Sequence, residues 1–133
     1  MILVDTSVLI GWFNHADNPK TIFFDSIVED DTWGISVMTL QEMLQGAKTS
    51  KEYNKLRIYL SDVDVYYLPQ KLDFWLQSSL LYMNLRHFGI TVRSIADTLI
   101  ASTAIYYNLE LLHNDRDFDF IAQHEPKLRN VAP

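Results

Sequence analysis

A chain of 133 residues with 48% hydrophobic and 13% aromatic residues suits one domain with a sizeable core, and we expect a single domain over residues 1–133. The absence of cysteine excludes disulfides and thiolate metal sites, and the formal net charge of −6 argues against a protein that wraps nucleic acid with a basic surface. No stretch approaches the roughly 20 apolar residues of a membrane span, and the apolar start is too short for a signal peptide, so we expect a cytoplasmic protein without a membrane partner.

The first half of the chain alternates short apolar runs with helical patterns. Ile-Leu-Val at residues 2–4 predicts a buried strand, which ends where Asp5-Thr6-Ser7 opens a helical segment. The next predicted elements are a helix from Pro19 to about Val28, a turn at Asp30, Asp31 and Gly34, a strand at 35–37, helices at 39–48 and 51–60, and a strand at 63–68 that is closed by Pro69.

The second half continues the alternation. The predicted elements are a long helix over 71–88 ended by Gly89, a helix over 94–107, a strand over 109–113, a short helix over 117–123, and a tail over 126–133 that is irregular or a short edge strand. Strands that alternate with helices predict an α/β fold with a parallel sheet covered by helices on both faces.

Acidic residues stand where several of these helices begin. They are Asp5, Glu42, Asp97, Asp115 and, two residues further on, Asp117. Each has a local explanation, because Asp is a favoured N-cap and because Thr or Ser followed three residues later by Glu or Asp is a capping box. Taken one at a time, these acids therefore indicate no more than helix starts.

The joint pattern of the acids favours a common site. Asp5, Glu42 and Asp115 come just after predicted strands, and the carboxyl ends of parallel strands lie at one edge of a sheet, where ligands bind. Carboxylates in one crevice repel one another unless a cation offsets their charge. Oxygen ligands without His or Cys suit a hard ion, so the pattern predicts a site for Mg²⁺ or Mn²⁺.

Four segments, in order, resemble motifs of the PIN-domain family. They are MILVDTSVLI, TLQEMLQG, SIADTLIASTAI and LLHNDRDFDFI, and the nearest resemblance is to the VapC-type toxins of toxin–antitoxin pairs. The resemblance covers nearly the whole chain. It implies a PIN-like α/β/α sandwich with a central parallel sheet and an endoribonuclease that hydrolyses RNA phosphodiester bonds with Mg²⁺ or Mn²⁺. It also implies a homodimer that a cognate antitoxin protein silences.

The resemblance carries over to individual residues. The catalytic, metal-binding acids would be Asp5, Glu42, Asp97 and Asp115, with Asp117 as an additional metal ligand. Thr6, and less closely Ser7, match polar residues beside the first acid. His113 departs from the family, which often has Thr or Ser there; we expect a structural role at the strand end in preference to a metal ligand or general base.

Substrate and partner surfaces are less specific in the sequence. Arg86, Arg93 and Arg116 are candidates for phosphate contacts, and Arg116 is the best of them because it follows Asp115 directly. An apolar groove for a partner helix is predicted around Trp12-Phe13 and around Tyr53, Leu56 and Leu60. A stripe at helical spacing predicts core or a dimer interface; it comprises Leu72, Trp75, Leu76, Ser79, Leu80 and Met83.

Two kinds of alternative compete with the nuclease interpretation. A response-regulator receiver domain needs an acid pair after the first strand and a Lys after the last, whereas this chain has Asp5 alone and Asp115 at the later position. A haloacid-dehalogenase phosphatase needs Asp-x-Asp, which Asp5-Thr6-Ser7 lacks. A catalytically silent PIN-like module that binds RNA or protein stays open, and a metal titration would distinguish it from the enzyme.

Overall fold

The computed structural model describes residues 1–92 and 94–133, and its centre is a parallel five-stranded sheet. The strands are β1 (Ile2–Val4), β2 (Trp33–Ser36), β3 (Asp64–Tyr66), β4 (Glu110–Leu112) and β5 (Arg129–Asn130). Their order is β3-β2-β1-β4-β5, and each neighbouring pair is parallel. The predicted α/β class with a parallel sheet is confirmed, and the tail contributes an edge strand, which was one of the two expected outcomes.

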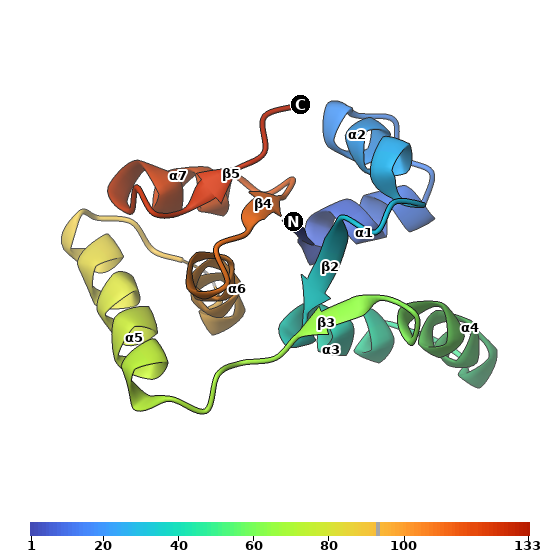
Figure 1. Ribbon diagram of the computed structural model, residues 1–133, viewed down its shortest axis with the longest axis horizontal. Coiled ribbons are helices and arrows are strands. Elements are labelled where there is room, and N and C mark those ends of the chain that lie inside the picture. The colour runs from blue at the N-terminus through green and yellow to red at the C-terminus, as the bar shows by residue number, and fades with distance from the viewer. Residues whose placement is uncertain (93) are drawn as a thin grey trace.

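Helices cover both faces of the sheet (Figure 1). They are α1 (Thr6–Phe13), α2 (Pro19–Ile27), α3 (Val37–Gln45), α4 (Ser50–Leu60), α5 (Leu72–His87), α6 (Ile95–Tyr106) and α7 (Arg116–His124). The first four lie with β2 and β3 on one side of the molecule, and the last three lie with β4 and β5 on the other. The architecture is the α/β/α sandwich that the sequence predicts.

Alternation along the strands divides the core in two. On β1, Leu3 contacts a cluster built by α5, α6 and α7, whereas Val4 contacts a cluster built by α1 to α4. Leu111 and Leu112 of β4 divide in the same way. Successive side chains of a strand point to opposite faces, so an uninterrupted apolar run supplies both cores.

The order of the strands places a switch point between β1 and β4. From β1 the chain moves outward to β2 and β3, and it then returns to the other side of β1 to form β4 and β5. Because the connections on the two sides run in opposite directions, the carboxyl ends of β1 and β4 form the topological switch point, the position of the ligand crevice in open α/β sheets. The backbone N–H of Asp5 donates to Leu112 O at 2.9 Å, so the two strand ends are hydrogen-bonded there.

Gly34 corrects one prediction of the sequence analysis. It was assigned to a turn, but it is buried within β2. A Cβ atom at this position would lie 2.7 Å from Asp64 O and 2.8 Å from the Tyr66 ring, so the β2–β3 pairing requires a residue without a side chain. Here glycine allows the close approach of two strands and does not mark a chain reversal.

The predicted Thr39–Glu42 capping box is wrong. Helix α3 begins three residues earlier, and its N-cap is Ser36, whose side chain accepts a hydrogen bond from Met38 N–H at 3.0 Å. Thr39 and Glu42 therefore lie inside the helix, one turn apart on the same face. By contrast, Gly89 has a φ of 77° just beyond α5, as a helix-ending glycine should.

Within residues 1–92 and 94–133, no helix is long and apolar enough to cross a membrane.

Candidate metal centre

Asp5 lies at the carboxyl end of β1 and caps helix α1. Its Oδ2 accepts hydrogen bonds from the Ser7 backbone N–H at 3.0 Å and from the Ser7 hydroxyl at 2.6 Å. The side chain is 5% exposed. Burial and the neighbouring Glu42 carboxylate raise the pKa of Asp5, although the hydrogen bonds from Ser7 act in the opposite direction. The local capping explanation thus holds, and the acid is also deeply placed in the crevice.

Glu42 reaches the same region from helix α3. Its Oε1 lies 2.9 Å from the Thr6 hydroxyl, which in turn lies 3.1 Å from the hydroxyl of Thr39. A hydroxyl carries one proton. Thr6 donates that proton to the carboxylate, so the contact between the two threonines is made with Thr39 as the donor. Two hydroxyls thereby fix the Glu42 side chain against the start of α1.

Three further acids converge from α6 and α7. Asp97 lies in the first turn of α6, Asp115 caps α7 and accepts from Asp117 N–H at 3.0 Å, and Asp117 is 7% exposed. One carboxylate oxygen from each lies within 4.8 Å of the other two. Three oxygens this close can share one cation.

Electrostatics connects all five acids. Burial, followed by the charges of Asp115, Asp5, Asp117 and Glu42 in decreasing order, raises the pKa of Asp97 to about 7. A carboxylic acid whose pKa is raised this far reflects its burial first and the repulsion from neighbouring like charges second. The structure therefore brings together the five acids that the sequence analysis singled out, from four separate segments of the chain.

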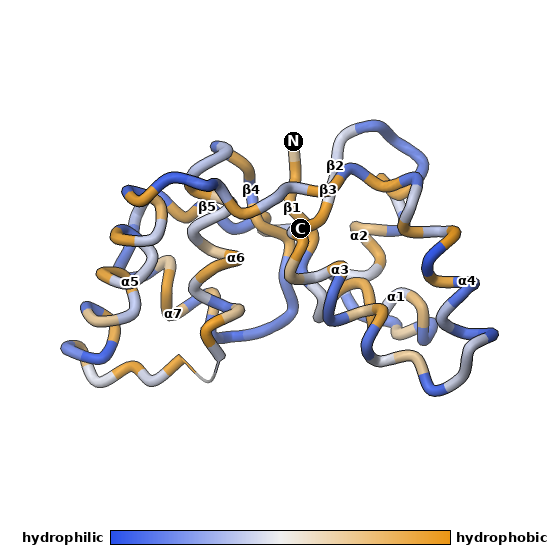
Figure 2. The backbone as a smooth tube through the Cα atoms, turned by 90° about the horizontal axis from the view of Figure 1, so that it is seen from below, coloured by the Kyte–Doolittle hydropathy of each residue, from blue (hydrophilic) through white to orange (hydrophobic). Residues whose placement is uncertain are grey.

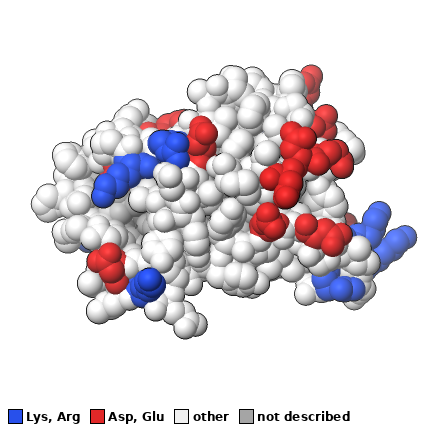
Figure 3. Space-filling model, in the orientation of Figure 1, with Lys and Arg blue, Asp and Glu red and all other residues white. Residues whose placement is uncertain are grey.

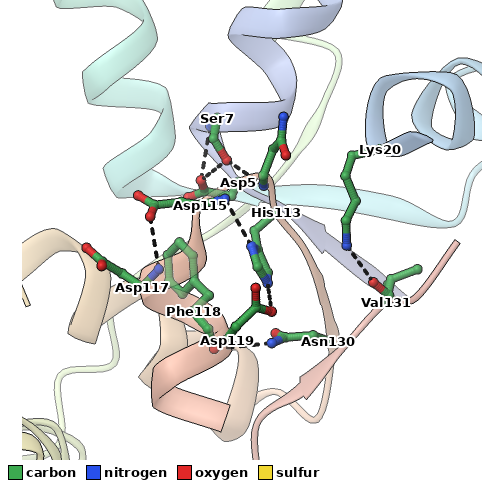
Figure 4. A network of polar contacts seen from close by, with 11 residues as sticks. Asp5, Ser7, Lys20, His113, Asp115, Asp117, Phe118, Asp119, Asn130 and Val131 are labelled. Atoms are coloured by element: carbon green, nitrogen blue, oxygen red, sulfur yellow. Dashed lines mark hydrogen bonds and ion pairs between the residues drawn. The ribbon is translucent and has the colours of Figure 1, made fainter. Parts of the chain in front are cut away.

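Ser7 joins two of these segments directly (Figure 4). Its hydroxyl donates to Asp5 and accepts a hydrogen bond from the backbone N–H of Asn114 at 2.9 Å. One oxygen atom thus ties the loop after β1 to the loop after β4, across 107 positions of sequence. Both loops carry an acid of the cluster.

His113 is a buried residue at the end of β4 and is 2% exposed. Its Nδ1 accepts from the Asp115 backbone N–H at 3.2 Å, so a neutral ring carries its proton on Nε2. This Nε2 lies 3.3 Å from Asp119 Oδ1 but makes no hydrogen bond to a described residue. Burial lowers the pKa of His113 against the opposing charge of Asp119, and the ring contacts the loop that carries Asp115.

The three candidate phosphate-binding arginines differ in what the structure shows of them. Arg116 is exposed and follows the α7 cap directly. Arg86 is exposed near the end of α5 and lies over the Tyr82 ring at 5.5 Å. Arg93 lies outside the described residues. Only Arg116 is adjacent in the chain to an acid of the cluster.

An apolar groove of about 670 Å³ opens beside Glu42, between α1, α3 and α4. Phe13 and Leu56 line it, as predicted. Three other predicted members do not: Trp12 packs on Phe24 and Tyr59, Leu60 is in the core, and Tyr53 borders a different depression. The sequence identified the helices of the groove, but side-chain direction decided which residues line it.

The stripe on α5 is a surface and is not core. Leu72, Leu76 and Met83 are 74%, 54% and 47% exposed, and Trp75 and Leu80 are also exposed. Of the two predicted roles, packing in the core is therefore wrong.

A comparison of the sequence with protein families matches the PIN domain over residues 2–123. The chain belongs to the PIN-domain family. The resemblance seen in the four sequence motifs is thereby confirmed, and the match spans every acid of the cluster in this PIN domain.

Known relatives agree with this assignment. Ribonuclease VapC11 of Mycobacterium tuberculosis and VapC ribonuclease Mb1587 of Mycobacterium bovis are each 29% identical to this PIN domain over 125 residues, which is 92% of either chain. Among solved structures, VapBC2 from Rickettsia felis, bound to a promoter DNA fragment, aligns with a TM-score of 0.76 at 23% identity over 98% of both chains. FitAcB from Neisseria gonorrhoeae aligns with a TM-score of 0.75 at 18% identity over 100% of this chain and 98% of its own.

The sequence analysis missed two contributors to the site of this PIN domain. Thr39 was read as a helix cap, yet its hydroxyl contacts Thr6 beside Glu42. Asn114 contributes its backbone N–H to Ser7, and a backbone contact leaves no mark on residue type. The sequence did contain a signal for Thr39. It lies three residues before Glu42, and on a helix that spacing places two side chains on the same face.

Proposed function

We propose that this PIN domain is a divalent-metal-dependent endoribonuclease and the toxin of a toxin–antitoxin pair. The observation that carries the proposal is the convergence of five carboxylates at the switch point between β1 and β4. They come from four segments, and three of them have oxygens within 4.8 Å of one another. A fold that concentrates this much negative charge requires a cation to offset it.

The donor set fits Mg²⁺ or Mn²⁺. All the candidate ligands are carboxylate oxygens, which hard cations prefer, and partial burial limits competition from water. Asp97, Asp115 and Asp117 would hold the ion, with the Asp5 and Glu42 carboxylates near enough to act on the same site. When bound, such an ion activates water for hydrolysis and offsets the charge of the phosphodiester.

The protein's own residues prepare the site. Asp97 would lose its proton on binding a cation, because burial and the four neighbouring acids raise its pKa in the metal-free protein. Thr6 and Thr39 orient Glu42 toward the crevice, and Ser7 holds Asp5 with both of its donors. These contacts set the carboxylates before substrate arrives, which reduces reorganisation during the reaction.

RNA is the substrate that the relatives favour. Both curated relatives carry the name ribonuclease, and each aligns with nearly the whole of this chain. Arg116, next to Asp115, is positioned to contact a phosphate of the bound strand. Because RNA is the proposed substrate, the proposed location is the cytoplasm.

A cognate antitoxin and a second copy of this chain are the proposed protein partners. Several structural neighbours are toxin–antitoxin complexes. Glu42 lines the groove between α1, α3 and α4, so an amphipathic antitoxin helix seated there would approach the acid cluster. The exposed stripe on α5 would be covered in a homodimer, and Leu76→Glu with Leu80→Glu should produce monomers in sedimentation experiments. Monomeric wild-type protein at micromolar concentration would contradict the dimer.

The enzymatic proposal is tested by incubating total cellular RNA with the purified protein and mapping the new ends. Cleavage should require Mg²⁺ or Mn²⁺ and should stop on addition of chelator. Calorimetric titration with Mn²⁺ separates the enzyme from a catalytically silent module. Binding that disappears in Asp5→Asn supports the enzyme, whereas no binding that depends on Asp5 favours the silent module.

A further inference from the structure

Positive charge is concentrated on α4 and on the residues just before it. Lys48, Lys51, Lys55 and Arg57 are four of its 11 Lys and Arg residues, and they fall within ten positions. All four are exposed. In the space-filling view, positive side chains project at the right-hand end of the molecule, where α4 lies (Figure 3). A local excess of this kind in a chain of net charge −6 indicates an electrostatic contact with an anionic partner.

The lysines of this segment form no ion pair among the described residues. Among residues 1–92 and 94–133, no carboxylate lies within ion-pairing distance of the Lys48, Lys51 or Lys55 ammonium groups. Glu52 is the acid in their midst, and its Oε2 accepts from the Lys48 backbone N–H at 2.8 Å, an interaction that tightens the start of α4. The lysine side chains are therefore available to an external ligand.

The basic helix lies on the same side of the molecule as the acid cluster. Figure 2 shows the connection between α3 and α4 at the lower edge of the molecule. The start of α6, whose first turn carries Asp97, also lies toward that edge. The groove beside α3 joins the two regions, because Glu42 and Lys55 both line it. Tyr53 of α4 is 43% exposed, and it borders a shallow depression together with Lys48.

We propose that α4 binds the RNA strand beyond the scissile phosphate, with Lys48, Lys51 and Lys55 on successive phosphates and Tyr53 against a base. The inference rests on the proposed nuclease function and names a substrate-binding surface for it. A phosphodiester held at the carboxylates must continue as a polyanion on either side, and the groove that Glu42 lines is also lined by Lys55. Lysine contacts to phosphate with aromatic stacking are the usual means of holding a single strand without strict sequence preference.

The test compares two variants of equal charge. Lys51→Gln with Lys55→Gln removes two cations from α4, and Lys71→Gln with Lys127→Gln removes two exposed cations outside α4. Affinity for a single-stranded RNA is measured in chelator, so that no cleavage occurs, at several salt concentrations. Loss of two phosphate contacts should make the salt slope shallower by about 1.4 and weaken binding roughly tenfold at low salt. The second variant should match the wild type.

Kinetics give an independent measurement. In Mg²⁺, the α4 variant should raise KM for long RNA and leave cleavage of a dinucleotide unchanged, because its single phosphodiester lies at the carboxylates and leaves no phosphate for α4. Tyr53→Leu should act in the same direction. An unchanged salt slope, or equal losses on long and short RNA, would overturn the proposal. An unchanged salt slope for RNA binding, together with weakened antitoxin binding, would also overturn the proposal and would assign the surface to the protein partner. Absence of metal-dependent cleavage by the wild type would instead contradict the nuclease function, since RNA binding in chelator is scored separately.

Discussion

Two edges of the same sheet carry acids, and only one has the features of a site. At the amino edge, Glu29, Asp30, Asp31, Asp62 and Asp64 surround an open depression beside Trp33 and Tyr59. All five of these acids are exposed. At the carboxyl edge the five acids of the cluster are buried or half-buried. The number of acids is equal, so the difference lies in burial and in convergence.

Repulsion between the carboxylates differs in strength at the two edges. Water and salt screen the exposed carboxylates, so their mutual repulsion costs little. At the carboxyl edge, burial and four like charges raise the pKa of Asp97 to about 7. Among the described residues, Asp97, Asp115 and Asp117 are grouped closely enough to share an ion, and the amino-edge acids are not. The number of acids alone therefore does not predict a metal site. Burial and close grouping of the carboxylates distinguish the carboxyl edge.

The largest predicted effect contrasts one acid from each edge. Asp97→Asn should lower the rate of metal-dependent RNA cleavage by more than roughly 100-fold, which exceeds the usual cost of losing an outer-shell partner of a metal ligand. Asp30→Asn changes the charge equally at the amino edge and should cleave like the wild type. Circular dichroism should show both variants folded. Equal activity of the two variants would remove the distinction between the edges.

A pH titration of stability sharpens the same contrast. The pKa of Asp97 is about 7 in the folded chain, against an ordinary value of 3.8, so between these values the folded state binds a proton that the unfolded state lacks. The free energy of unfolding of the metal-free protein should therefore fall as pH rises from about 4 to about 7 and then level off. Asp97→Asn should reduce this slope and Asp30→Asn should retain it. Mn²⁺ affinity should rise over the upper part of that range, since the cation displaces the proton.

The contact between the two acid-bearing loops gives a smaller effect. Ser7→Ala deletes the hydroxyl that donates to Asp5 and accepts from Asn114 N–H, so Mn²⁺ affinity should fall by about tenfold and stability by about 1 kcal/mol. Ser61→Ala is the matched control, because its hydroxyl donates to Ile58 O away from the cluster. Calorimetry and thermal unfolding measure both quantities. Unchanged Mn²⁺ affinity in Ser7→Ala would show that the bridge is dispensable.

The smallest effect is expected at the amino edge. Asp30→Asn with Asp31→Asn removes two exposed charges, and stability should change by no more than about 0.5 kcal/mol. The sign should be stabilising at low salt, since like-charge repulsion is relieved, and the change should vanish at high salt. Denaturant unfolding at two ionic strengths measures it. A large loss of stability would mean that these acids are structural.

The family could be predicted from the sequence, because four motifs in order carry the acids, and the family match spans all of them. So were most elements: apolar runs marked the strands, Pro19 marked the start of α2, and Gly89 marked the end of α5. These features are local, since they arise from residues a few positions apart. Most helix ends were accurate to one or two residues, but both ends of α3 were missed although Ser36 and Gly46 cap it.

Only the tertiary structure decided how the acids meet. Asp97 follows no strand, and Glu42 lies within a helix instead of at its cap, yet both enter the crevice because α6 and α3 pack beside the switch point. The role of His113, the strand position of Gly34 and the exposure of the α5 stripe were also set by packing. Composition and periodicity act over a few residues, whereas these features depend on crossovers that bring distant segments to one edge of a sheet.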